Sequence, residues 1–231
     1  MKKVKVALIG TGNWCLQHCR VLTQHSQVEF CGILGRNKER TKRRAKLFDV
    51  PFYLDLKELI KNQKPNLINI CLPNEHHFDM TMDVIKSSCN LFVEKPLVFK
   101  MQEAKKLLAE AKKRKLFFGI NFNWRYSTPV RMALKAIKGN KLGDINFITW
   151  RFGGTGGGGN KFGNLIETQC HGFDMLEFLN GPIQSVHSFM TNKTKNGYST
   201  FIISLKFANQ SIGSILGSYD TSYAYPNTHY M

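Results

Sequence analysis

Acidic residues are scarce in this chain. Its 231 residues include 16 Asp and Glu against 33 Lys and Arg, a formal net charge of +17. Such an excess attracts phosphates and polyanions over long distances, which concerns partners and not the fold. Much of it lies on segments with a helical pattern, 105–115 and 135–141, where a solvated face is the simpler interpretation. Because no helix-turn-helix, zinc or RNP-like pattern accompanies the charge, we expect no specific nucleic-acid partner.

Long apolar runs and paired cysteine motifs are also missing. The first apolar segment, 4–9, has only the length of a strand, so we expect neither a signal peptide nor a membrane span. The six cysteines show no CxxC and no metal-ligand spacing. Cys15, His18 and Cys19 could share one helical face, but we interpret them as small packing residues beside a polar histidine and predict no metal. This cysteine usage fits a reducing, cytoplasmic location.

The first half of the chain alternates between apolar runs of strand length and helical patterns. The expected strands are 4–9, 28–34, 67–72, 91–93 and 117–121. The expected helices run from the residue after Gly12 to about 24, and over 39–48, 54–62, 76–88 and 101–115. This alternation predicts βαβ units, and therefore a Rossmann-type, doubly wound parallel sheet of the α/β class.

The pattern changes near residue 123, which divides the chain into predicted domains 1–122 and 123–231. Beyond it the expected helices are 129–139 and 171–179, and the expected strands are 145–152, 183–190, 199–207 and 211–218. The predicted result is an α+β domain with one mostly antiparallel sheet. The glycine-rich segment 153–159 lacks the Gly-Lys-Ser/Thr ending of a P-loop, so we interpret it as a substrate-side loop.

The strongest local signal is the pair of glycines at 10 and 12, between the first strand and the first helix. Glycines allow a tight turn and let the backbone approach a pyrophosphate, which the unpaired N–H groups of the helix start then bind. The third small position of this motif holds Cys15 in place of Gly or Ala, which still permits close packing. The predicted pyrophosphate-binding residues are Gly10, Gly12, Asn13 and Trp14.

The end of the second strand indicates which dinucleotide is preferred. A site for NAD would carry Asp or Glu here to bond the ribose hydroxyls, whereas this chain has Gly35 followed by Arg36. Lys38 and Arg40 lie nearby in the sequence, which leaves room and positive charge for a 2′-phosphate. We therefore favour NADP over NAD. A loop that is basic by chance is the alternative.

Polar residues follow the next two long strands, at the sheet edge where ligands bind in open α/β folds. They are Pro73, Asn74 and His77 after one strand and Glu94-Lys95-Pro96 after the other. Taken singly, the first three are also common turn or cap residues. A lysine fixed at this edge directs its charge towards a bound nicotinamide, so we assign both groups to the cofactor site.

These motifs together resemble those of the Gfo/Idh/MocA family, which includes glucose-fructose oxidoreductase and inositol dehydrogenase. The resemblance covers nearly the whole chain. The segments that carry it are Gly10-x-Gly12-x-x-Cys15-x-x-His18, Pro73-Asn74-x-x-His77, Glu94-Lys95-Pro96, Asn123-Trp124-Arg125-Tyr126, the run from Gly139 to Gly143 and Glu167-x-x-x-His171-x-x-Asp174. The last of these is similar to the family's Asp-x-x-x-His-x-x-Asp pattern.

The resemblance implies roles for three residues: Lys95 orients the substrate, His171 is the catalytic base and Glu167 is its carboxylate neighbour. These roles suit alcohol oxidation, in which a carbinol loses a hydride to the nicotinamide and a proton to a base. Lys95 would also stabilise the developing alkoxide. If 167 and 171 lie on one helix, they share a face. The candidate substrate-binding residues are Arg125, Tyr126 and Asp174, with Arg151 and Trp150 as further sugar contacts, Trp150 being equally a core candidate.

Two departures from the family pattern bear on activity. Glu167 is one methylene longer than the usual aspartate, which can move its carboxylate by about 1 Å. Family members continue beyond the equivalent of Ser218 with further strands, whereas this chain stops at Met231. We therefore expect an incomplete second domain with an unpaired sheet edge.

The preferred function is reversible oxidation of a secondary hydroxyl on a sugar, cyclitol or nucleotide sugar with NADP or NAD, by a homo-oligomer formed through the second sheet. Two alternatives stay open. One is a non-catalytic, nicotinamide-binding sensor or scaffold of the same fold, against which the presence of both Lys95 and His171 argues. The other is polyanion binding, which rests on the charge alone.

Overall fold

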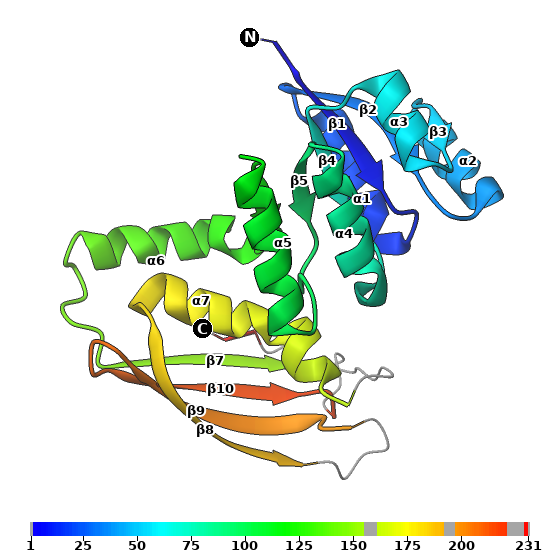
Figure 1. Cartoon of the computed structure of the whole chain (residues 1–231). Helices are drawn as coiled ribbons and strands as arrows, with labels where there is room; N and C mark the ends of the chain where they lie inside the picture. The colour runs from blue at the N-terminus through cyan, green and yellow to red at the C-terminus, as the bar shows by residue number, and fades with distance from the viewer. Residues whose placement is uncertain (1, 155–160, 192–196, 221–228, 231) are drawn as a thin grey trace. The chain divides into compact units, whose positions relative to one another are not determined.

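The computed structural model describes residues 2–154, 161–191, 197–220 and 229–230. The chain divides into two units, Met1–Asn121 and Phe122–Met231, which are coloured blue to green and green to red in Figure 1. Each unit has its own sheet and its own buried core. No helix in the described ranges is long and apolar enough to cross a membrane.

The first unit is built on a parallel sheet of six strands in the order β3-β2-β1-β4-β5-β6. The strands are β1 (Val4–Ile9), β2 (Val28–Leu34), β3 (Phe52–Tyr53), β4 (Leu67–Ile70), β5 (Asn90–Val93) and β6 (Phe118–Ile120). The strand order reverses between β1 and β4. In an open α/β sheet this reversal leaves a crevice at the carboxyl ends of the strands.

Helices connect these strands and cover both faces of the sheet. They are α1 (Asn13–Gln24), α2 (Lys38–Leu47), α3 (Leu56–Gln63), α4 (His77–Lys86) and α5 (Met101–Lys113), with the 3₁₀ turn η1 (Asn74–His76) before α4. Helices α2 and α3 begin where the side chains of Asn37 and Asp55 accept a hydrogen bond from a backbone N–H three residues on.

The two faces of the first sheet have separate cores. On one face Leu8 and Ile33 pack with Cys15, Cys19 and the α2 residue Ala45. On the other face the neighbouring strand residues pack against the helices that follow, through Leu59, Met82, Val84, Ile85, Leu107 and Ala111. Because successive side chains of a strand point to opposite faces, this division shows that the sheet is doubly wound. The predicted fold class is confirmed.

The second unit contains a sheet in the order β11-β7-β10-β9-β8. Its strands are β7 (Phe147–Gly153), β8 (Ile183–Thr191), β9 (Thr200–Phe207), β10 (Ile212–Ser218) and β11 (His229–Tyr230). The pair β7 and β10 is parallel and the other neighbours are antiparallel. The helical segments are η2 (Asn123–Tyr126), α6 (Thr128–Lys138), η3 (Asn164–Thr168) and α7 (Cys170–Asn180).

Helix α7 lies over one face of this sheet (Figure 1). The contact depends on Gly172, because a Cβ there would lie 2.6 Å from the Trp150 ring. Trp150 is 2% exposed and donates from Nε1 to Gln169 Oε1 at 2.9 Å. Of the two interpretations left open for Trp150, a core residue is therefore correct and a sugar contact is wrong.

Several expected boundaries were wrong for identifiable reasons. Strand β3 was missed because two residues carry no periodicity. The helix expected over 76–88 begins as a 3₁₀ turn at Asn74, and the strand expected to reach 72 ends at Ile70. The expected helix 171–179 is preceded by a π-helical turn. Most of the glycine-rich segment 153–159 lies outside the described residues.

Candidate functional site

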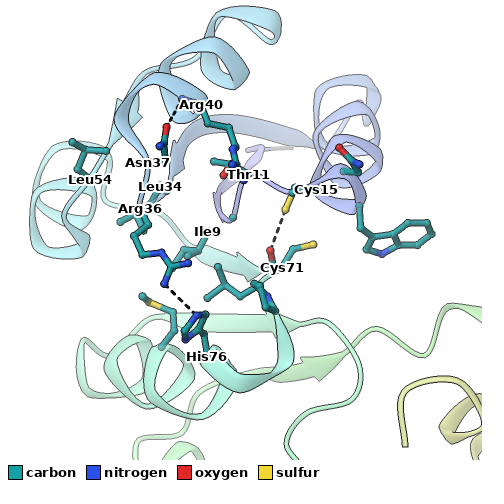
Figure 2. A pocket seen from close by; sticks show the side chains of 18 of the residues that line it. Ile9, Thr11, Cys15, Leu34, Arg36, Asn37, Arg40, Leu54, Cys71 and His76 are labelled. Atoms are coloured by element: carbon teal, nitrogen blue, oxygen red, sulfur yellow. Dashed lines mark hydrogen bonds between the residues drawn. The ribbon is translucent and has the colours of Figure 1, made fainter. Parts of the chain in front are cut away.

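A cleft of about 840 Å³ lies in the first unit, at the carboxyl ends of β1, β2 and β4. Figure 2 shows side chains from all three strand ends around it. The glycine turn lines this cleft. Gly10 has φ +132°, and a Cβ there would lie 2.0 Å from the carbonyl oxygen of Cys71, so no other residue fits this conformation. The tight turn that the sequence predicts is therefore required by the backbone.

Gly12 differs from Gly10 because no atom of the described residues fills the space beside it. Its φ is −68°, and the nearest atom to a Cβ placed at this position would be Cys15 Sγ at 4.0 Å. The turn then enters α1, whose first N–H groups have no partner in the helix. Space next to a glycine at a helix start, facing a cleft, is what a pyrophosphate needs. The residues present fit a dinucleotide.

Arg44 of α2 holds the turn from the side. It donates from Nε to the carbonyl of Thr11 at 3.3 Å and from Nη2 to Asn13 Oδ1 at 3.4 Å. Its guanidinium therefore adds a positive charge next to the predicted pyrophosphate position. Arg44 was not among the predicted residues, although its place one helical turn after Arg40 put it on the same side of the helix.

The end of β2 carries no acidic side chain and has no room for one. A Cβ at Gly35 would lie 2.4 Å from Thr41 Oγ1 and 2.5 Å from Thr11 Cγ2. Arg36 and Arg40 line the cleft here, together with Asn37. Lys38 is exposed as the first residue of α2 and does not line it. The basic character predicted for this end of the cleft is thus carried by the two arginines.

The wall opposite Arg36 comes from η1 and α4. It consists of Pro73, His76, Asp79, Met80 and Asp83. His76 accepts a hydrogen bond from Arg36 across the cleft, with 3.3 Å between Nη1 and Nε2 (Figure 2). The motif predicted from the sequence includes Pro73 and the neighbouring His77 but not His76. Its position beside a predicted ligand-binding motif was the available signal.

Glu94 follows β5 and is 5% exposed, yet it is surrounded by donors. Its Oε1 accepts from Trp14 Nε1 at 2.9 Å, from His18 Nε2 at 2.7 Å and from Asn121 Nδ2 at 2.5 Å. Its Oε2 accepts from the backbone N–H of Lys95 at 3.1 Å. One carboxylate thus ties α1, β5 and the end of β6 together.

These donors determine the charge of Glu94. Burial by itself raises the pKa of a carboxyl group, but the hydrogen bonds from His18, Asn121 and Trp14 outweigh it and lower the pKa of Glu94 to about 2. The other ring nitrogen of His18 lies 2.8 Å from Asn69 Nδ2. His18 is therefore engaged in this network, and the interpretation of Cys15 and Cys19 as packing residues agrees with their 2% exposure.

His77 joins the two loops that carry the predicted edge motifs. It is fully buried, with Nδ1 2.8 Å from the carbonyl of Pro96 and Nε2 2.9 Å from the carbonyl of Leu72. Lys95 precedes Pro96 through a cis peptide bond. Lys95 is thus held on both sides, by Glu94 before it and by His77 behind Pro96. Asn74, Lys95, His77 and Glu94, all assigned to the cofactor from the sequence, lie outside the cleft lining.

The candidate catalytic residues of the second unit lie where a π-helical turn meets α7. Glu167 is in η3, closed by the bond from Gln169 N to the carbonyl of Asn164 at 3.0 Å. His171 is in the first turn of α7, half-buried between the rings of Phe122 and Trp124 at 6.0 Å and 6.2 Å. Glu167 and His171 therefore do not lie on one regular α-helix, the condition under which they were expected to share a face. Single π-helical turns occur frequently at functional sites.

Two of the candidate substrate residues bind each other. Arg125 Nε lies 3.0 Å and 2.9 Å from the two carboxylate oxygens of Asp174, and Nη2 lies 2.5 Å from Oδ1. This pairing raises the pKa of Arg125. The guanidinium also lies 4.8 Å from the centre of the Phe178 ring. The pair fastens η2 to α7, while the third candidate, Tyr126, is 78% exposed.

Comparison with known proteins identifies the family to which these features belong. Residues 4–122 match the oxidoreductase family with an NAD-binding Rossmann fold, and residues 130–230 match the Gfo/Idh/MocA C-terminal domain. The chain belongs to the Gfo/Idh/MocA family of oxidoreductases. The predicted resemblance is confirmed over both units.

The sequence identity between this chain and individual relatives is low. The chain is 26% identical over 197 residues to an oxidoreductase from Synechocystis, covering 78% of this chain and 52% of that protein. It is 22% identical over 214 residues to D-glucoside 3-dehydrogenase from Escherichia coli, covering 86% and 61%. The structure resembles WlbA dehydrogenase from Bordetella pertussis, solved with NADH and UDP-GlcNAcA, with a TM-score of 0.87, 18% identity and coverage of 98% and 69%. The chain thus spans about half to three fifths of these two curated relatives.

Proposed function

We propose that this chain transfers a hydride between NADP or NAD and a secondary hydroxyl of a sugar, cyclitol or nucleotide sugar. The observation that carries the proposal is the cleft at the end of β1, where Gly10 makes the turn and the space beside Gly12 faces the first N–H groups of α1. This arrangement suits a pyrophosphate. Bound there, the cofactor would supply a nicotinamide ring that accepts or gives a hydride.

In the proposed mechanism, His171, Lys95 and Glu167 each have a separate role. His171 takes the proton from the substrate hydroxyl, because a neutral imidazole is a good base near neutral pH. Lys95 stabilises the alkoxide that forms as the proton leaves. Glu167 orients the imidazole of His171. Glu94 and His77 act indirectly in this proposal, because their hydrogen bonds hold Lys95 and Pro96 in place.

Sugar-like substrates are supported by the relatives, one of which is a D-glucoside dehydrogenase and one of which was solved with a nucleotide sugar. Within the second unit Tyr126 offers an exposed hydroxyl and ring for such a ligand. Arg125 and Asp174 contribute indirectly in this proposal, because their mutual ion pair fixes the segment that carries Tyr126.

NADP is the proposed preference. Gly35 leaves no carboxylate to bond a ribose 2′-hydroxyl, and Arg36 and Arg40 supply positive charge at the same end of the cleft. NAD remains the second choice, and WlbA was solved with NADH.

The proposed assembly is a homo-oligomer that forms through the open face of the second sheet. Phe189, Ile202 and Leu216 are direct neighbours on β8, β9 and β10, and the first two are 74% and 52% exposed. Adjacent apolar side chains on one sheet face are typical of an interface. The six cysteines form no disulfide in the described chain, which supports the proposed cytoplasmic location.

The proposal is tested first by titration with NADPH and NADH, followed through tryptophan fluorescence. Trp14 lines the cleft and is 54% exposed, so a bound dinucleotide should quench it. Turnover is then measured with a panel of glucosides, inositols and nucleotide sugars. Lys95→Ala should abolish turnover and leave dinucleotide binding within about twofold, because Lys95 lies outside the cleft lining. Full activity of this variant would remove the catalytic assignment, and binding without any turnover would favour a sensor or scaffold.

A further inference from the structure

A hydrogen bond crosses the cleft. It joins Arg36, which follows β2, to His76 in η1, which follows β4, and so passes over the end of β1 between them (Figure 2). A guanidinium has donors and no acceptor. The ring nitrogen Nε2 of His76 must therefore accept this bond at 3.3 Å, and it carries no proton in this arrangement. The two side chains face each other at the end of the cleft that lacks an acidic residue.

The surroundings of His76 are mixed in charge. Asp79 and Asp83 line the same wall from α4, and Glu75 precedes His76 in η1. Arg36 and Arg40 face it from the loop after β2 and from α2. His76 is half-buried, so its ring can exchange protons with solvent. Among the described residues that line the cleft it is the one histidine, a side chain whose charge ordinarily changes between pH 5 and 8.

We propose that His76 determines specificity for a dinucleotide with a 2′-phosphate, and that it does so in its protonated form. The inference rests on the proposed dinucleotide site. A phosphate placed between the two side chains takes over the donors of Arg36, and this leaves Nε2 of His76 facing an anion. Protonation then turns Nε2 from an acceptor into a charge-assisted donor to the phosphate. NADH has an uncharged 2′-hydroxyl in place of the 2′-phosphate, so it offers a protonated His76 no negative charge to pair with.

Ionisation of the phosphate and protonation of His76 change the affinity in opposite directions as the pH changes. A phosphomonoester loses its second proton near pH 6, so binding to Arg36 and Arg40 alone strengthens as the pH rises. Protonation of His76 acts in the opposite direction, because it adds a positive charge as the pH falls. Substitution of His76 should therefore weaken NADPH binding at low pH much more than at high pH.

The experiment compares His76→Gln with the unmodified chain by titration with NADPH and with NADH at pH 6 and pH 8. Glutamine can still accept the bond from Arg36 but cannot become charged. The matched control is His25→Gln, an exposed histidine at the opposite end of α1 from the glycine turn. At pH 6 His76→Gln should raise the Kd of NADPH about three- to fivefold, a range typical of one exposed charge pair. At pH 8 the change should be under about twofold.

The remaining outcomes separate the inference from the proposed function. The Kd of NADH should stay the same in His76→Gln at both pH values, and His25→Gln should change neither ligand. Equal weakening of NADPH at both pH values, or equal weakening of NADH, would show a structural role and overturn the inference while leaving the dinucleotide site intact. Failure of the unmodified chain to bind either dinucleotide would overturn the proposed function, and this inference with it.

Discussion

Gly10 and Gly12 have different roles in the same turn. Gly10 is required by the fold, because its φ is positive and a Cβ would overlap a backbone carbonyl. Gly12 has an ordinary extended conformation and open space beside it. An alanine substitution at each glycine can therefore separate the effect on folding from the effect on ligand binding.

The first prediction concerns these glycines. Gly12→Ala should change the free energy of unfolding by less than about 1 kcal/mol, because its φ and ψ suit alanine. It should weaken dinucleotide binding at least about tenfold, since the new methyl group occupies the space beside the helix start. Gly10→Ala should instead destabilise the chain by several kcal/mol or prevent folding. Urea unfolding and fluorescence titration measure the two effects, and undiminished binding by Gly12→Ala would contradict the proposed pyrophosphate position.

The second prediction at this scale concerns the charge of Glu94. Its pKa of about 2 lies below the ordinary value of 4.5, so its ionised form stabilises the fold. The contribution, on the order of 3 kcal/mol, is fully present above pH 4.5 and is lost as the pH falls towards 2. Glu94→Gln should therefore cost about 2–3 kcal/mol near pH 7, because one side-chain donor then faces the N–H of Lys95.

The measurement is urea unfolding of Glu94→Gln and the unmodified chain near pH 7, pH 4.5 and pH 3. The difference in free energy should shrink below pH 4.5. Glu75→Gln is the matched control, because Glu75 is exposed in η1, and it should unfold like the unmodified chain at each pH. A difference that is the same at all three pH values would mean that packing, and not charge, makes Glu94 important.

At the scale of secondary structure, α7 packs tightly against the sheet where Gly172 contacts Trp150. Gly172→Ala should raise helix propensity but place its Cβ 2.6 Å from the Trp150 ring, with a net loss of about 1–3 kcal/mol in unfolding free energy. Thermal or urea unfolding measures the loss. The double variant Gly172→Ala with Trp150→Phe should lose less than the sum of the single variants, because the smaller ring makes room. Strict additivity would contradict a direct clash.

The elements that could be predicted from the sequence are those with periodicity or a specific stop signal. Helix α7 ends at Asn180, followed by Gly181 and Pro182, and β1 ends at the glycine turn, so these bounds were close. Strand β3 has two residues, and in the π-helical turn η3 the buried side chain of Asn164 donates to the carbonyl of Ser199 at 2.7 Å. A partner 35 residues away leaves no local signal.

In the candidate site too, contacts between residues far apart in the sequence could not be predicted. Motif spacing placed Gly10, Gly12 and Arg36 at one cleft, because a parallel sheet brings strand ends together. It did not show that Trp14, His18 and Asn121 converge on Glu94, since those contacts join residues 27 to 80 positions apart. Glu94 and His77, which were expected to contact the cofactor, instead form hydrogen bonds that hold the segment around Lys95 in place.

At the scale of the whole molecule, one face of the second sheet is covered by α7 and the other exposes apolar side chains. The double variant Phe189→Ser with Ile202→Ser should lower the mass found by light scattering at micromolar concentration, with an unchanged circular dichroism spectrum. Leu47→Ser, at a 63% exposed residue of α2, is the control and should leave the mass unchanged. A monomeric unmodified chain would refute the proposed interface.

Gly35 has a consequence for how this cleft can change over evolution or in the laboratory. An aspartate in place of Gly35 would put its Cβ 2.4 Å from Thr41 Oγ1 and 2.5 Å from Thr11 Cγ2, so the two threonines already occupy that volume. Such a step demands smaller residues at both threonines beforehand. Placing an acidic side chain at position 35 therefore takes at least three substitutions, whereas changing the charge of the neighbouring Arg36 takes one.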